Sequence, residues 1–195
     1  MASGFAKCLT AILGRRQHRK IAIICLRDDA GIDLLKCLCG TIKERRGDKV
    51  GQRAYTGTKS SLKTDFDFIT VGVGWDQPAS YHLWTAAQFH DADGFIWVVD
   101  ETETDLLLAE SQEEMRNARK GRRLDNGLVQ AGVSPEAPWL VLLDFKHNPL
   151  SIAEAARQAE LVVEAAGDDL NWSVCAVSTT TLEGLKEVMD GFTRK

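Results

Sequence analysis

The segment Lys20–Gly40 combines the elements from which a phosphate-binding site is built. Ile21–Leu26 is continuously apolar, as expected for a buried parallel strand, and Leu34, Leu35 and Leu38 then repeat at helical spacing. A strand that passes through a short loop into a helix can place backbone N–H groups and the helix N-terminus around phosphate oxygens. The motif that confirms such a loop, GxxxxGK followed by Ser or Thr, also requires a lysine and a hydroxyl residue.

The loop lacks the residues that this chemistry requires. Alignment on the helix puts Cys25 at the first glycine and Gly31 at the lysine, and a shift of one residue still offers Ile32 in place of lysine. The loop also carries three carboxylates, which repel a polyphosphate. Two interpretations stay open here: a degraded phosphate loop, or the ordinary first unit of an α/β protein. The residues at the candidate phosphate positions are Asp28, Asp29, Ala30, Gly31, Ile32 and Asp33.

Composition narrows the class of protein. A chain of 195 residues with 44% apolar content can bury one sizeable core, which predicts one main domain. The net charge of −4 gives no reason to expect nucleic acid as a partner. No apolar run is long enough for a membrane span and no signal peptide is evident, so we expect an intracellular protein whose five cysteines are reduced.

The first 19 residues differ in character from the rest. Apolar side chains fall on one helical face and a basic flank follows, a pattern typical of a helix that lies on anionic lipid. The same pattern also fits a helix that folds back on its own domain, and the sequence does not separate the two. We therefore predict an amphipathic helix over 1–19 and a globular domain over 20–195. The residues concerned are Phe5, Leu9, Ile12, Leu13, Arg15, Arg16, Arg19 and Lys20.

The remaining chain alternates strands with helices. We expect Glu44–Asp65 to be an exposed loop with one weak edge strand at Arg53–Thr56, and Leu106–Val129 to be one long helix. Alternation of this kind predicts a three-layer α/β fold, with a mostly parallel central sheet and helices on both faces. Further strands are expected at Phe66–Val73, Gly94–Asp100, Trp139–Leu143 and Trp172–Val177, and further helices at Tyr81–Phe89, Ser151–Ala166 and Leu182–Phe192.

In this order of elements the chain resembles the Arf branch of the small GTPases. The opening FAKCLTAILGRRQHRKI is similar to that family's amphipathic helix and first strand, and LLKCL is similar to its helix after the phosphate loop. DGFIWVVD at Asp93–Asp100 and the closing GLKEVMDGF also match framework segments. The resemblance covers nearly the whole chain and implies a P-loop GTPase fold in the cytoplasm, with a possible site of action at endomembranes.

The family's nucleotide-binding motifs are mostly substituted. The switch motif DxGGQ reads TVGVGWDQ in this chain. Gly72 keeps the glycine that contacts the γ-phosphate, whereas Thr70 replaces the aspartate. Gln77, the catalytic candidate, is displaced toward the C-terminus relative to the glutamine of the motif. The guanine-reading NKxD reads Phe145-Lys146-His147-Asn148, which keeps the lysine and loses the carboxylate. By resemblance, the remaining base-contacting position is Ser178.

These losses predict a pseudo-GTPase that binds proteins as a scaffold, with nucleotide binding lost or very weak. If the lysine, the metal-binding hydroxyl and the guanine-binding aspartate each contribute about 1.5–3 kcal/mol, their joint loss costs about 5–9 kcal/mol. We therefore expect no cofactor, no metal site and no catalytic residue, and protein partners of unknown identity. The alternative is a divergent GTPase that binds GTP or GDP with Mg²⁺ through unorthodox residues. The histidines show no paired metal spacing, so an unrelated α/β metalloenzyme has little support.

We predict that the first 19 residues supply the membrane affinity of the protein, and that this affinity falls as salt rises. Four basic residues, each worth about 1 kcal/mol near an anionic surface, act there together with a few apolar side chains. Sedimentation with anionic liposomes should pellet the full chain more than a chain that begins at Lys20. Equal pelleting of the two proteins would refute the assignment.

Overall fold

The computed structural model describes the sheet, one helix and parts of the connections. The described residues are 18–25, 28–47, 53–60, 65–72, 89, 91–100, 109, 111–113, 115–116, 121–123, 129–131, 137–145, 157 and 172–185. The predicted amphipathic helix lies outside them, except that β1 begins at His18, before the expected start of the domain at Lys20.

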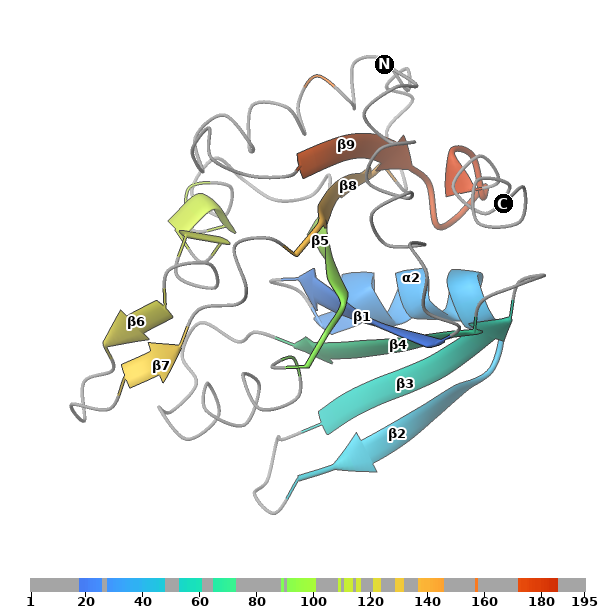
Figure 1. Cartoon of the computed structure of the whole chain (residues 1–195). Helices are drawn as coiled ribbons and strands as arrows, with labels where there is room; N and C mark the ends of the chain where they lie inside the picture. The colour runs from blue at the N-terminus through green and yellow to red at the C-terminus, as the bar shows by residue number, and fades with distance from the viewer. Residues whose placement is uncertain are drawn as a thin grey trace.

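A seven-stranded sheet forms the centre of the molecule, in the order β2-β3-β4-β1-β5-β8-β9 (Figure 1). All neighbours from β4 to β9 pair in parallel, and β2 and β3 add an antiparallel extension at one side. The prediction of a mostly parallel sheet is therefore confirmed. The strands are β1 (His18–Cys25), β2 (Ile42–Arg46), β3 (Arg53–Ser60), β4 (Asp65–Gly72), β5 (Gly94–Asp100), β8 (Trp139–Asp144) and β9 (Trp172–Val177).

Both faces of the sheet are covered by apolar packing. Helix α2 (Asp28–Cys39) packs on β4, β3 and β1, and its Leu34, Leu35 and Leu38 are buried against that face. The opposite face carries a second core cluster that includes Phe89 and Met115 from helical positions. The apolar residues of β1 and β8 are buried because successive side chains point to opposite faces and each face is covered.

Three predictions about local structure are wrong in part. The strand expected at Arg53–Thr56 is confirmed within β3, but it does not lie at the edge of the sheet, because β2 pairs with it on the outer side. The loop expected from Glu44 begins inside β2, a strand that the sequence concealed because its exposed residues are all charged. The expected long helix ends early: a hairpin of β6 (Gly121–Arg123) and β7 (Val129–Ala131) occupies its second half. In the closing segment, Leu182 has a positive φ of 64° and turn residues follow, so the helix predicted there begins no earlier than Leu185.

The described cysteines form no disulfide with one another. Burial raises the pKa of the Cys39 thiol to about 11; nearby Lys59 lowers it and Asp67 raises it. Since the thiolate is the reactive form, this pKa disfavours reaction of Cys39 near neutral pH. Among the described residues no helix is long and apolar enough to cross a membrane.

Two glycines with positive φ, which differ in the space around them, allow a test of the described turn after β9. Gly40 (φ 72°) ends α2 and has nothing within 4 Å of an added Cβ, whereas an added Cβ at Gly184 (φ 74°) would collide with the backbone of Ala176. We expect Gly40→Ala to lower the free energy of unfolding by about 1–2 kcal/mol through backbone strain alone. Gly184→Ala should cost clearly more, as measured by urea denaturation. Equal losses would contradict the described turn after β9.

Candidate functional site

The carboxyl ends of the parallel strands bring the predicted site residues to one edge of the sheet. Cys25 and Gly72 are register partners at the ends of β1 and β4, and β8 and β9 end together at Asp144 and Val177. In open α/β sheets, ligands bind outside this edge. Gly72 therefore lies next to Cys25, the residue that precedes the candidate phosphate segment.

The candidate phosphate residues form the first turn of α2. The helix begins at Asp28, so Asp28, Asp29, Ala30 and Gly31 belong to the helix and do not form an open loop after β1. Only Leu26 and Arg27 separate the two elements. A phosphate cradle of the GxxxxGK type needs a longer stretch of non-helical backbone between strand and helix. The helix therefore begins earlier along the chain than a motif of that type would allow.

Gly31 is the residue that permits this arrangement. It is buried, and an added Cβ would collide with the hydroxyl of Thr70 and would lie 2.6 Å from the Cys25 sulfur. Cys25 and Thr70 are themselves nearly inaccessible, at 0% and 1% exposure. The space beside Gly31 is therefore filled by one side chain from β1 and one from β4. A side chain at position 31 would therefore require the side chains of Cys25 and Thr70 to move.

Within the described part of the chain, no residue forms a hydrogen bond with the buried hydroxyl of Thr70. A buried hydroxyl that is left unpaired costs about 1–3 kcal/mol. The apolar packing around it must offset this cost. In the sequence comparison Thr70 replaces an acidic residue, and in the structure it packs directly against the position of the missing lysine.

Two carboxylates near the start of α2, those of Asp29 and Asp33, interact with neighbouring groups of the same helix. The backbone N–H of Ala30 donates to the Asp29 carboxylate at 3.1 Å, so a side chain of the protein supplies negative charge at the positive end of the helix. Further along, Lys36 Nζ lies 3.4 Å from the Asp33 carboxylate on the exposed side of α2. Ile32 is partly buried and offers no hydroxyl for a metal ion.

The strand ends that would contact a base are also tied to each other. Buried Asp144 accepts hydrogen bonds from the backbone N–H of Thr179 at 3.0 Å and from its hydroxyl at 2.7 Å. The hydroxyl oxygen of Ser178 accepts from the N–H of Thr181 at 3.1 Å, and Ser178 is only 1% exposed. The oxygen of Ser178 is therefore directed into its own turn.

Some predicted residues lie outside the described part of the chain: Gln77, Lys146 and Asn148. Phe145, by contrast, is buried, and its N–H donates to the carbonyl of Val177 at 2.9 Å. The described residues contain no group of three or more His, Cys, Asp or Glu side chains that could hold a metal ion.

Sequence reasoning missed the two contacts that define this edge. Cys25, Gly31 and Thr70 were each noted as departures from a motif, but their mutual packing depends on strand register. Asp144 and Thr179 were not singled out at all. The sequence feature that could have identified them is Asp144, a carboxylate at the end of an otherwise apolar strand. A charge buried at such a place requires hydrogen-bond donors.

Comparison with known proteins supports the fold and extends no further. No family model and no curated protein matches the chain. Among solved structures, the Arl6 BBS3 small GTPase from Trypanosoma brucei, with a bound nucleotide analogue, matches with a TM-score of 0.60 and 15% identity over 90% of this chain and 95% of that chain. The G domain of the FeoB iron transporter of T. maritima matches with a TM-score of 0.53 and 19% identity, over 90% and 96% of the two chains. The protein therefore has the α/β fold of small GTPase domains.

The packing around Gly31 predicts an unusual response to alanine. At an ordinary position inside a helix, Gly→Ala stabilises by about 1 kcal/mol. Because the added methyl would meet Thr70 and Cys25, we expect Gly31→Ala to destabilise by about 1–3 kcal/mol in urea denaturation. The control is the same substitution in a Cys25→Ala/Thr70→Ala background, where its cost should shrink or reverse. A stabilising effect of Gly31→Ala in the unmodified chain would contradict the described packing.

Proposed function

We propose that this protein is a pseudo-GTPase, a small-GTPase fold that serves as a protein-binding module and has lost tight nucleotide binding. The observation that carries the proposal is the packing of Gly31 against Thr70 and Cys25. GTP with Mg²⁺, the ligand that the fold implies, does not fit the described residues, because Gly31 and Ile32 offer neither a cation for the phosphates nor a hydroxyl for the metal ion.

The chemistry of the phosphate half supports this proposal. An active site of this kind needs a cation and a metal-binding hydroxyl next to the phosphates, and the chain offers Gly31 and Ile32 at those positions. The Asp29 carboxylate already interacts with the helix N-terminus, so an incoming phosphate would meet like charge. Binding would require the turn to unwind and the carboxylate to move, and both changes cost free energy.

The base half supports the same conclusion. The described oxygen atoms at the ends of β8 and β9 already accept hydrogen bonds from Thr179 and Thr181. A base that entered this edge would have to replace those bonds with bonds of its own. The end of β8 and the turn after β9 instead hold each other through Asp144 and Thr179, as expected for a rigid scaffold.

The sequence supports a place for this module in the Arf-like branch. On that basis we propose protein partners in membrane trafficking, and a cytoplasmic protein that reaches endomembranes through its first 20 residues. The partners would recognise a constant surface, since no bound nucleotide is available to change the conformation of the fold. The proposal assigns no resident cofactor.

We expect the purified protein to carry no GDP or GTP, and millimolar GTP with Mg²⁺ to change its melting temperature little. A ligand stabilises a protein by RT ln(1 + [L]/Kd), so weak binding gives a small shift. Chromatography of the denatured supernatant measures copurified nucleotide, and a thermal melt measures the shift. A rise of several degrees at micromolar GTP would support a divergent, working GTPase.

Restoring the two motif residues should not restore binding. Gly31→Lys with Ile32→Thr supplies the missing side chains, but the lysine Cβ collides with Thr70 and Cys25. We expect reduced stability and no calorimetric binding of GTP with Mg²⁺. Ile32→Thr alone is the control, since it should stay folded and also fail to bind. Nanomolar affinity in either variant would show that the remaining site is intact.

A further inference from the structure

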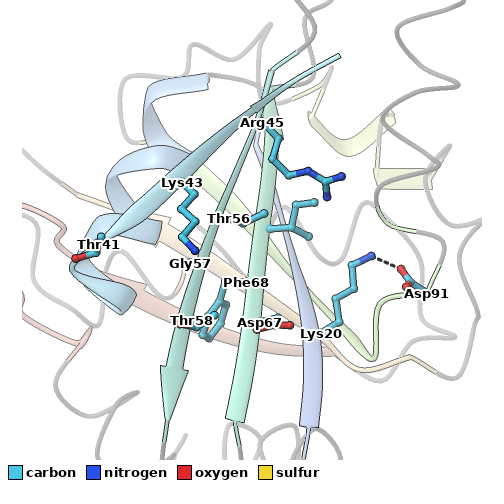
Figure 2. Close-up of a pocket in the computed structure, with 11 residues that line it drawn as sticks. Lys20, Thr41, Lys43, Arg45, Thr56, Gly57, Thr58, Asp67, Phe68 and Asp91 are labelled. Atoms are coloured by element: carbon cyan, nitrogen blue, oxygen red, sulfur yellow. Dashed lines mark hydrogen bonds and ion pairs between the residues drawn. The ribbon is translucent and has the colours of Figure 1, made fainter. Parts of the chain in front are cut away.

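A cavity of about 580 Å³ lies on the face of the sheet that α2 does not cover (Figure 2). Its walls come from β1, β2, β3 and β4, and the side chains of Lys20, Lys43 and Arg45 lie over it. Lys20 is the register partner of Asp67 near the amino ends of β1 and β4, whereas the edge described above lies at their carboxyl ends. Arg45 lies farther along the strands, since it pairs with Ala54 and Ala54 pairs with Val71. The cavity therefore extends along the strands on the face opposite α2.

The charges of β2 are divided between the two faces of the sheet. Lys43 and Arg45 pair in register with Thr56 and Ala54 and share their face, which is the cavity face. The only acidic residue of the strand, Glu44, points to the other face, where it lies 3.1 Å from Arg46 and 3.7 Å from Arg53. The alternation of the strand thus places two of its basic residues and no acidic residue on the cavity side. Three basic residues, Lys20, Lys43 and Arg45, line the cavity together with two acidic ones, Asp67 and Asp91.

The acidic residues that line the cavity already have partners. Asp67 lies 2.8 Å from His18, and Asp91 forms an ion pair with Lys20. Lys43 and Arg45 make no ion pair with any residue in the described part of the chain. Both are exposed, so they keep mobile cationic ends at the rim of a hollow.

We infer that this cavity, which we call the β2 pocket, binds a phosphate-bearing anion through Lys43 and Arg45. A guanidinium group and an ammonium group on one face can contact several oxygens of one phosphate group, and arginine can do so with two parallel bonds. The hydroxyls of Thr56 and Thr58 line the same cavity and can donate to further oxygens. The volume suits a small polyanion, since ligand cavities span about 300–1,000 Å³.

Two sources can supply this chemistry: a soluble phosphate ester or the headgroup of an anionic lipid. The position of the β2 pocket next to Lys20 favours the lipid, because the basic, apolar segment that precedes Lys20 in the chain has the composition of a membrane-binding helix. The inference does not depend on the proposed loss of nucleotide binding.

The test uses the full chain and two variants with the same change in net charge. Lys43→Gln/Arg45→Gln removes the cations of the β2 pocket, and Arg46→Gln/Arg53→Gln removes two cations from the other face of the same strands. Calorimetric titration with soluble inositol trisphosphate tests the free ester. Sedimentation with phosphatidylcholine vesicles, with and without phosphatidylinositol bisphosphate, tests the headgroup.

We expect the unmodified chain to bind at least one of these probes, the pocket variant to bind it about tenfold more weakly or less, and the control variant to keep most of the affinity. Binding to both probes identifies the ester group itself as the ligand, and binding to the vesicles alone identifies the lipid. Equal weakening in both variants would show a nonspecific charge effect and overturn the inference, as would no binding to either probe. Circular dichroism confirms that the variants, which change exposed residues, stay folded.

Discussion

The arrangement at the carboxyl edge of the sheet depends on one close contact, the packing of the first turn of α2 against β1 and β4. That contact is possible only because position 31 has no side chain, which lets the Cys25 thiol and the Thr70 hydroxyl fill the space beside it. Interiors are packed as densely as organic crystals, so a filled space of this kind excludes any further group. The fold has the architecture of small GTPase domains, and the space beside position 31 is filled by side chains of β1 and β4.

The electrostatics of the same turn follow from this packing. A helix N-terminus attracts negative charge, and in nucleotide-binding folds a phosphate meets that need. Here Asp29 provides the charge through its bond to the N–H of Ala30. At the neighbouring strand ends, Asp144 and Thr179 satisfy each other in the same way. Both halves of the edge thus contain internal hydrogen bonds that involve a carboxylate.

The sequence predicted the sheet and its parallel order because the buried strands are long apolar runs, a signal that is strong for a sheet covered on both faces. The sequence did not predict β2, because its exposed residues Lys43, Glu44 and Arg45 show no apolar alternation. This strand depends on its pairing with β3. The prediction failed again near Gly121, where helical periodicity continued into a hairpin. The sequence showed each of Cys25, Gly31 and Thr70 separately as a departure from a motif. Their joint effect required the register of β1 with β4, which no local pattern encodes.

The most direct test of the proposed loss of nucleotide binding is to monitor residues at the carboxyl edge of the sheet by NMR while GTP and Mg²⁺ are added. In a ¹⁵N-labelled sample of the full chain, the amide resonances of Gly31, Ser178 and Thr179 report on the phosphate half and the base half separately. With millimolar GTP and Mg²⁺, the account predicts that these three resonances stay where they are. Saturable shifts of all three, with Gly31 moving together with the base-side residues, would show that the turn of α2 opens to admit nucleotide and would contradict the central claim.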